Sequence, residues 1–412
     1  MSIRRATIVP FAVVWALGHA AAAHAADCAQ TSVGITPLND LGTGQYLGLY
    51  QGGLYPNGSN AMPPAHAAIG LTRAAQIRPL DPAGNPDPSG RYVLLSIGMS
   101  NTTQEFCGTA DGQNCPSYSF VGQATADPRV NHSTLEIIDG AAGGQTAGTW
   151  DDPTDTNYDR VRDTRLAPAG LTEAQVQAVW VKVANAAPTD SLPDPNADAF
   201  TLLSQLGDIL RTLQTRYPNV KLVFLSSRIY AGYASTSLNP EPFAFESGLA
   251  CKWTVEAQIR QMAGGGIDPL ASDLNLNTVA PWVAWGPYLW ADGLTPRSDG
   301  LIWQCTDFNT DGTHPSVSGR QKVGTLLLQF FSSSPHTTPW FLRPGADSIG
   351  DMNCDDRLDN FDIDPFVLAL TRPAEYEAQF PDCPRRNGDI NGDGQLNNFD
   401  IDPFVRLLTQ GN

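Results

Sequence analysis

Residues 92–285 alternate between short apolar runs and longer amphipathic stretches. The apolar runs have the length of buried strands, and residues 197–216 repeat apolar side chains at helical spacing. Pro218 and Asn219 end that helix directly before the apolar run 221–225. A helix between apolar strands favours a crossover in a parallel sheet. We predict strands at 92–95, 135–138, 179–183, 221–225 and 280–285, and helices at 197–216, 255–262 and 317–331.

A serine follows the first predicted strand in the stretch Gly98-Met99-Ser100. An apolar run that ends in Gly-x-Ser brings a hydroxyl to the carboxyl edge of a parallel sheet, where open α/β sheets bind their ligands. Gly and Ser also end strands at ordinary turns. A nucleophilic role for Ser100 therefore requires a base elsewhere in the chain.

One of the six histidines lies in a segment suited to that role. His19 and His24 fall in the N-terminal leader, and His132 precedes a Ser-Thr pair before a strand. The segments around His66 and His336 are rich in Pro, Ser or Thr and resemble surface loops. His314 follows Asp311 on a Gly-containing turn, so the carboxylate can reach imidazole Nδ1 and leave Nε2 free for a serine. The alternative is a helix-capping turn with Ser316 as N-cap and a solvated His314.

Two motifs resemble a known enzyme family. Gly98-Met99-Ser100-Asn101 and Asp311-Gly312-Thr313-His314-Pro315 are similar to the first and last blocks of the SGNH (GDSL-like) hydrolases, particularly the sialate O-acetylesterase and acetylxylan esterase type. The resemblance covers about residues 30–332. It implies an α/β fold, namely a flavodoxin-like three-layer α/β/α sandwich with a parallel sheet. It also implies a serine esterase that acts on polysaccharide or glycan esters without a catalytic cofactor. In that enzyme Ser100 is the nucleophile, His314 the base and Asp311 its orienting carboxylate.

The middle blocks of the family resemble residues 139–145 and 179–186. They imply three donors for an oxyanion hole: the N–H of Ser100, the N–H of Gly144 and the amide of Asn185. Gly143 adjoins Gly144, so the choice between these glycines stays open. Met99 and Val183 stand where the family usually has Asp and Gly. These departures favour an alternative in which the domain is a non-catalytic, extracellular glycan-binding or scaffold component.

Residues 1–26 have the form of an export signal. Arg4 and Arg5 precede an apolar core at 8–17, and residues 23–25 form a small-x-small cleavage site. The core is too short to span a bilayer, and no other stretch reaches that length. We therefore expect a secreted protein. The formal net charge of −17 and the pI of about 4.6 argue against nucleic acid or anionic lipid as partners.

Seven cysteines lie beyond the leader, where export permits disulfides. Proximity in the sequence suggests three pairs, Cys107 with Cys115, Cys251 with Cys305 and Cys354 with Cys383, which leaves Cys28 unpaired. The chain has no Cys-x-x-Cys spacing, which disfavours metal ligation by these residues.

The C-terminal region contains an internal repeat. After a Ser-, Pro- and Thr-rich connector at 332–346, residues 351–362 recur 38 positions later as residues 389–400. Oxygen ligands at positions 1, 3, 5, 9 and 12, with a backbone carbonyl at 7, are the set by which a loop binds Ca²⁺. The predicted ligands are Asp351, Asn353, Asp355, Arg357, Asp359 and Asp362 in the first copy, and Asp389, Asn391, Asp393, Gln395, Asn397 and Asp400 in the second.

Charge supports two structural calcium ions in this region. Residues 347–412 hold 14 acidic residues against 5 arginines, so cations would relieve their mutual repulsion. The repeat resembles a type I dockerin, a small all-α module that attaches secreted enzymes to cohesin-bearing scaffolds. The resemblance implies a cohesin-like partner read by the residues after each loop, Asn360-Phe361 and Asn398-Phe399. We thus expect a signal peptide at 1–26, a hydrolase domain at 27–331, a linker at 332–346 and a docking module at 347–412.

Overall fold

The protein is built around a parallel sheet. The computed structural model describes residues 25–343, 349–355, 357–391 and 394–410, so nearly all of the expected signal segment lies outside the described residues. The strands are β3 (Tyr92–Gly98), β4 (Leu135–Asp139), β5 (Val176–Lys182), β6 (Leu222–Leu225) and β7 (Trp282–Trp285). Their order β4-β3-β5-β6-β7 is the doubly wound order of flavodoxin-like folds. The predicted fold class is confirmed.

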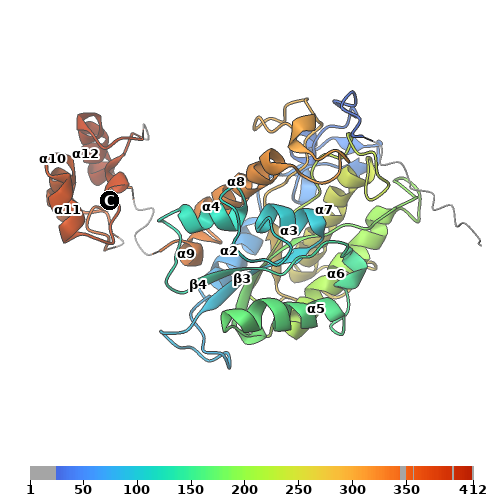
Figure 1. The fold of residues 1–412 in the computed structure, drawn as a ribbon, viewed down its shortest axis with the longest axis horizontal. Coiled ribbons are helices and arrows are strands. Elements are labelled where there is room, and N and C mark those ends of the chain that lie inside the picture. Colours follow the sequence, from blue (N-terminus) through green and yellow to red (C-terminus); the bar gives the residue numbers. More distant parts are fainter. Residues whose placement is uncertain (1–24, 344–348, 356, 392–393, 411–412) are drawn as a thin grey trace, which may run out of the picture.

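Helices cover both faces of this sheet (Figure 1). On one face lie α2 (Pro64–Ala74), α3 (Ser100–Phe106), α4 (Phe120–Ala126) and α8 (Val317–Ser333). On the other lie α5 (Thr156–Val161), α6 (Asp198–Arg216) and α7 (Phe243–Met262). The lead-in holds α1 (Leu38–Leu41) and a hairpin of β1 (Gln45–Tyr46) and β2 (Tyr50–Gln51).

Aromatic residues of the strands form the core on the face covered by α2, α3 and α8. Trp180 and Phe224 are register partners in β5 and β6, and both are buried. Trp180 stacks on Phe106 of α3, and Phe224 contacts Phe331 of α8 edge-on. Because both sides of the sheet are covered, the strands are largely apolar, and the polar residues within them, such as Ser96 and Lys182, are buried.

The expectation that His66 and His336 lie in surface loops is wrong. Both are buried and stack on Trp282, each with ring centroids 5.0 Å apart. Their Nε2 atoms contact the backbone carbonyl oxygens of Val283 and Ala67 at 2.9 and 3.1 Å. Burial lowers the pKa of His66 to about 4, so this ring is neutral and serves the core.

The disulfides confirm two predicted pairs and correct the third. Cys107 pairs with Cys115 and Cys354 with Cys383. Cys305, however, bonds Cys28 rather than Cys251, which is a free, buried thiol inside α7. The fold brings the N-terminal segment beside residue 305, and a pair 277 positions apart has no signal in sequence proximity.

The expected linker at 332–346 belongs in part to the sheet domain. Helix α9 (Thr338–Phe341) buries Trp340 and Phe341. The Trp340 carbonyl oxygen accepts a 2.6 Å hydrogen bond from Tyr92 Oη, and Leu342 forms a β-bridge with Val130. Apolar side chains within the Ser- and Pro-rich stretch therefore extend the domain to residue 342, and residues 344–348 lie outside the described residues.

The C-terminal repeat forms a helical unit with its own core (Figure 1). Helix α10 (Ile363–Thr371) follows the first loop, α11 (Pro373–Gln379) comes next, and α12 (Ile401–Gln410) follows the second loop. Phe366 and Phe404 occupy equivalent repeat positions and stack face to face at 4.0 Å. A helix therefore follows each of the two loops. In the described residues no helix is long and apolar enough to cross a membrane.

Candidate active site

The end of β3 places Ser100 at the sheet edge. Met99 is extended, and Ser100 is the first residue of α3. Gly98 is required there because a Cβ would overlap the Lys182 carbonyl oxygen. As the first helical residue, Ser100 has a backbone N–H without an intrahelical partner.

His314 lies within hydrogen-bonding distance of both Ser100 and Asp311. Ser100 Oγ is 2.8 Å from His314 Nε2, and His314 Nδ1 is 2.6 Å from Asp311 Oδ2. Partial burial favours a raised pKa for Asp311. Three hydrogen bonds outweigh the effect of burial and lower the pKa of Asp311 below its usual value. They come from the His314 side chain and from the backbone N–H groups of His314 and Thr313. The ionised carboxylate therefore holds the imidazole with Nε2 toward the serine.

Two further contacts fix the loop that carries the histidine. Gly312 has φ of +64°, and a Cβ there would overlap the Tyr233 carbonyl oxygen. Asn101, buried beside Ser100, donates its amide N–H to the Thr313 carbonyl oxygen at 3.1 Å. Asn101 thus ties the nucleophile's helix to the histidine loop. It is part of the first family-like block, but its role depends on a contact 212 residues away.

A buried carboxylate anchors α3 from the neighbouring strand. Asp139, at the end of β4, accepts hydrogen bonds from Ser96 Oγ at 2.5 Å and from Thr103 Oγ1 in α3. Burial raises the pKa of Asp139. The positioning role of Asp139 has no signal in the sequence, because the resemblance to the second block points to the glycines after it.

A second buried contact supports α3 from β5. Glu105 of α3 and Lys182 of β5 form an ion pair whose side chains are both inaccessible to solvent. Burial raises the pKa of Glu105 and lowers that of Lys182 to about 8. Removing either partner would leave a buried charge, so this pair makes the position of α3 sensitive to mutation.

The glycine turn expected to supply an oxyanion donor lies beside the nucleophile. Gly144 has φ of +77° and lines the same cavity as Ser100. A Cβ on Gly143 would lie 3.9 Å from Ser100 Cβ. Both glycines are therefore close to the reacting serine, and Gly144 is the one that faces the cavity.

Asn185 lines this cavity too, but its amide hydrogens are directed elsewhere. Asn185 Nδ2 donates to Asp198 Oδ1 at 3.0 Å and to Gln205 Oε1 at 2.9 Å. Both hydrogens of the amide are thus used. This arrangement leaves the Asn185 side chain no N–H for an oxyanion, contrary to the role implied by the resemblance.

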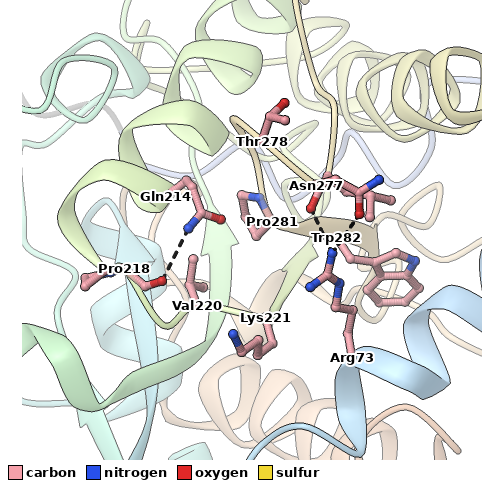
Figure 2. A pocket seen from close by; sticks show the side chains of 10 residues that line it. Arg73, Gln214, Pro218, Val220, Lys221, Asn277, Thr278, Pro281 and Trp282 are labelled. Atoms are coloured by element: carbon pink, nitrogen blue, oxygen red, sulfur yellow. Dashed lines mark hydrogen bonds between the residues drawn. The ribbon is translucent and has the colours of Figure 1, made fainter. Parts of the chain in front are cut away.

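The cavity at Ser100 has a volume of about 130 Å³. Leu238, Ala184 and Met99 supply apolar wall, and Arg228 and Asn239 supply polar groups. Figure 2 shows a different pocket, lined by Arg73, Lys221 and Asn277 among others. It adjoins the amino ends of β6 and β7, at the edge opposite Ser100. The described residues that line it include no Ser or Cys paired with a His.

The two acidic loops fold alike. Asp362 and Asp400, at position 12, are fully buried. Asp362 Oδ1 accepts from the N–H of Met352 at 2.7 Å, and Asp400 Oδ1 accepts from that of Ile390 at 2.9 Å. At position 6 of the second loop, Gly394 has φ of +86°. In each loop, the carboxylate at position 12 therefore holds the first residues of the loop by hydrogen bonds.

The donor set of these loops fits a hard cation. Asp351, Asp362 and Asp400 are buried, and carboxylate and amide oxygens dominate the remaining predicted positions. Among the described residues, however, no three His, Cys, Asp or Glu side chains gather closely enough to hold a metal ion. Two acidic residues of the loops lie outside the described residues: Asp393, at position 5 of the second loop, and Asp356, at position 6 of the first. Calcium binding therefore stays a prediction.

No family model matches the chain, and no curated protein matches its sequence. Among solved structures it is similar to an acetylxylan esterase from Geobacillus stearothermophilus, at 14% identity over 59% of this chain and 95% of that one, with a TM-score of 0.27. It is similar to an extracellular lipase from Streptomyces rimosus, at 13% identity over 57% and 97%, with a TM-score of 0.29.

A salicylyl-acyltransferase from a tetracycline biosynthetic pathway matches at 14% identity over 60% of this chain, with a TM-score of 0.31. The chain spans 56% of that protein. All these likenesses are loose, and the fold assignment rests on the strand order and the helices of the chain itself.

Proposed function

We propose that the protein is a secreted serine esterase that removes acetyl or similarly small acyl groups from a polysaccharide or glycan. The observation that carries the proposal is the hydrogen-bonded series Ser100 Oγ, His314 Nε2, His314 Nδ1 and Asp311 Oδ2 at the carboxyl edge of the sheet. Nucleophile, base and orienting carboxylate are the three parts that acyl transfer to serine requires. The small cavity beside Ser100 suits a short acyl group.

The geometry supports a two-step mechanism. Ser100 Oγ attacks the ester carbonyl carbon while His314 Nε2 takes its proton, and the imidazolium is stabilised by Asp311. The imidazolium then protonates the departing alcohol, which leaves an acyl-serine. Water, deprotonated by His314, attacks that acyl group and releases the carboxylic acid. The N–H groups of Ser100 and Gly144 supply the hydrogen bonds to the tetrahedral oxyanion.

The C-terminal unit extends this proposal. Its two loops would each hold one Ca²⁺ through side-chain oxygens and the carbonyls of Arg357 and Gln395. Equivalent positions of both copies expose apolar side chains: Phe361 and Phe399, Ile363 and Ile401, and Val367 and Val405. This repeated surface is suited to a cohesin-like protein partner, which would place the esterase near its substrate.

A single experiment tests the catalytic part. Purified protein should hydrolyse p-nitrophenyl acetate, and Ser100→Ala should lower kcat by at least about 10⁴-fold because the nucleophile is lost. Ser117→Ala is the matched control, since Ser117 lies outside the cavity. A folded wild-type protein without activity on any acyl ester would instead favour the alternative function, a glycan-binding component with an inactive site.

A further inference from the structure

Arg228 is a buried cation at the wall of the active-site cavity. It follows β6 at the same sheet edge as Ser100, and only 2% of its surface is exposed. Its backbone N–H bonds Ser247 Oγ at 3.1 Å, which fixes the residue against α7. The backbone of Arg228 is thus fixed between β6 and α7, and its side chain is buried inside the domain.

The guanidinium has no protein partner among the described residues. Nε and Nη2 are buried without a hydrogen bond, and no ion pair includes this side chain. A buried charge without a partner costs several kcal/mol, so proteins normally pair such groups. An unpaired arginine beside a nucleophile therefore points to a partner supplied from outside the chain.

The acidic groups nearest to Arg228 are occupied by other donors. Glu105 is paired with Lys182. Glu241 accepts from Trp290 Nε1 at 2.7 Å and from the Ala231 N–H at 2.8 Å. Asp311 is bound by His314. The negative charges of these acids favour the charged form of Arg228 from a distance, but the acids accept no hydrogen bond from its N–H donors.

A second unpartnered group faces the same cavity. Asn239 is 3% exposed and donates its Nδ2 hydrogen to the Asn185 carbonyl oxygen at 3.1 Å, while Asn239 Oδ1 is buried and accepts no hydrogen bond from a described residue. Two residues that line the cavity thus have unused hydrogen-bonding groups, the N–H donors of Arg228 and Oδ1 of Asn239. An acyl ester that carries a carboxylate and a hydroxyl would satisfy both.

We propose that Arg228 binds a carboxylate of the substrate and so makes the esterase selective for acidic esters. The inference rests on the proposed esterase function and names its substrate class. The carboxylate has two possible sources: the alcohol part, as in an acylated uronic acid, or the acyl part, as in the half-ester of a dicarboxylic acid. A planar guanidinium suits a carboxylate through two parallel N–H donors.

Two matched pairs of substrates test the proposal. The first is an O-acetylated methyl galacturonoside and its C6 methyl ester, and the second is p-nitrophenyl hemisuccinate and p-nitrophenyl propionate. In one of these pairs, the carboxylate stands on the part of the substrate that Arg228 binds. In that pair, kcat/KM of the wild-type protein should be about 10- to 100-fold higher for the charged substrate, which is the effect expected of one charged hydrogen bond. The pair that shows the preference identifies the source.

Arg228 variants connect the preference to the residue. In Arg228→Gln the ratio of kcat/KM within the preferred pair should fall toward one, whatever the absolute rates, and Arg228→Lys should keep part of it. Arg78→Gln removes an exposed positive charge near the opposite sheet edge and should leave the ratio unchanged. A structural role for Arg228 predicts that the charged and neutral substrates slow equally, and this result would overturn the proposal.

If Arg228→Gln does not fold, inhibition of the wild-type protein by carboxylates tests the proposal instead. Free methyl galacturonoside or succinate should inhibit competitively, at concentrations where neutral methyl galactoside and propionamide do not. Hydrolysis of both members of each pair at equal kcat/KM overturns the carboxylate site while leaving the esterase in place. Failure to hydrolyse any ester refutes the proposed function itself.

Discussion

The sheet domain and the C-terminal repeat keep their acidic side chains in position by different means. In the sheet domain, which has a large apolar core, Asp139 and Glu105 are each held by a side chain from another strand or helix. Asp311 is held by the His314 side chain and by backbone N–H groups of their shared turn. In the repeat, Asp362 and Asp400 are held by backbone N–H groups of their own loops. The repeat buries only a small apolar cluster of its own.

From this difference we predict which region depends on an external ligand. Ser100, His314 and Asp311 are joined by hydrogen bonds within the chain, so their geometry needs only the fold. The repeat carries 14 acidic residues in residues 347–412, and its internal hydrogen bonds do not neutralise them. We therefore expect chelation to affect the repeat and to spare the active site, and the following predictions test that contrast.

The largest effect should come from Asp311→Asn. An amide in place of the carboxylate removes the acceptor that fixes the tautomer of His314, so kcat should fall by about 10⁴-fold with little loss of stability. Steady-state hydrolysis of p-nitrophenyl acetate measures this change. Asp194→Asn, in an exposed turn, is the control. If kcat falls less than tenfold, the pairing within the sheet domain does not organise catalysis.

Calcium removal should have a large effect confined to the repeat. At a free concentration a thousand times its Kd, a bound ion stabilises a fold by about 4 kcal/mol. Upon chelation with disulfides intact, amides of α10 and α12 should therefore lose protection from hydrogen exchange, and those of β3 and β5 should not. Hydrolysis of p-nitrophenyl acetate should continue.

A variant pair refines the calcium prediction. Asp389→Ala removes position 1 of the second loop, and calorimetry should then detect one Ca²⁺ site in place of two. Glu377→Ala removes an exposed acid from α11 and should keep both. Unchanged protection of α10 and α12 without calcium would mean that the repeat folds without an ion, and the contrast between the regions would be lost.

Local patterns explain why the main features were predictable. The strands are buried on both faces and therefore appear as continuous apolar runs. Ser100 directly follows such a strand, and Asp311 and His314 share one short turn. Each of these features lies within a few residues of the sequence, so the predicted fold agrees with the structure, which also brings Ser100, His314 and Asp311 together. Their catalytic roles stay a prediction.

Features that depend on distant segments were missed. Helix α7 begins at Phe243, twelve residues before the predicted start, because its first half is buried nearly all round and has no amphipathic period. The Cys28–Cys305 bond, the burial of His66 and the unpaired Arg228 arise from contacts between remote parts of the chain. No short pattern encodes them.

A moderate effect is expected from Glu246→Gln in the sheet domain. Burial raises the pKa of Glu246 to about 7, while Tyr46 and the Leu192 N–H donate to its carboxyl group. The folded protein then binds a proton that the unfolded chain has lost. This residue's contribution to stability thus declines as the pH rises from about 4.5 to about 7, by at most about 3 kcal/mol.

The Glu246→Gln variant should lack this residue's share of the loss of stability between about pH 4.5 and pH 7. Denaturant titration at pH 5 and pH 8 gives the free energy of unfolding of the wild-type and Glu246→Gln proteins. The change in this free energy between the two pH values should be smaller in the variant, and Glu377→Gln, at an exposed site, serves as control. Equal pH dependence of all three proteins would show that the carboxyl of Glu246 titrates normally. Acidic side chains of the sheet domain would then be less constrained by burial than the structure indicates.

The smallest effect should come from Asn185→Ala. Removing a true oxyanion donor typically lowers kcat by about 10²- to 10³-fold. Because both amide hydrogens of Asn185 are donated to Asp198 and Gln205, we expect a loss below about tenfold, caused by small shifts of the cavity wall. Asn277→Ala, in the pocket at the opposite sheet edge, controls for the loss of an amide. A loss above a hundredfold would mean that Asn185 turns toward the substrate during the reaction, and the site would then be less preassembled than its hydrogen bonds imply.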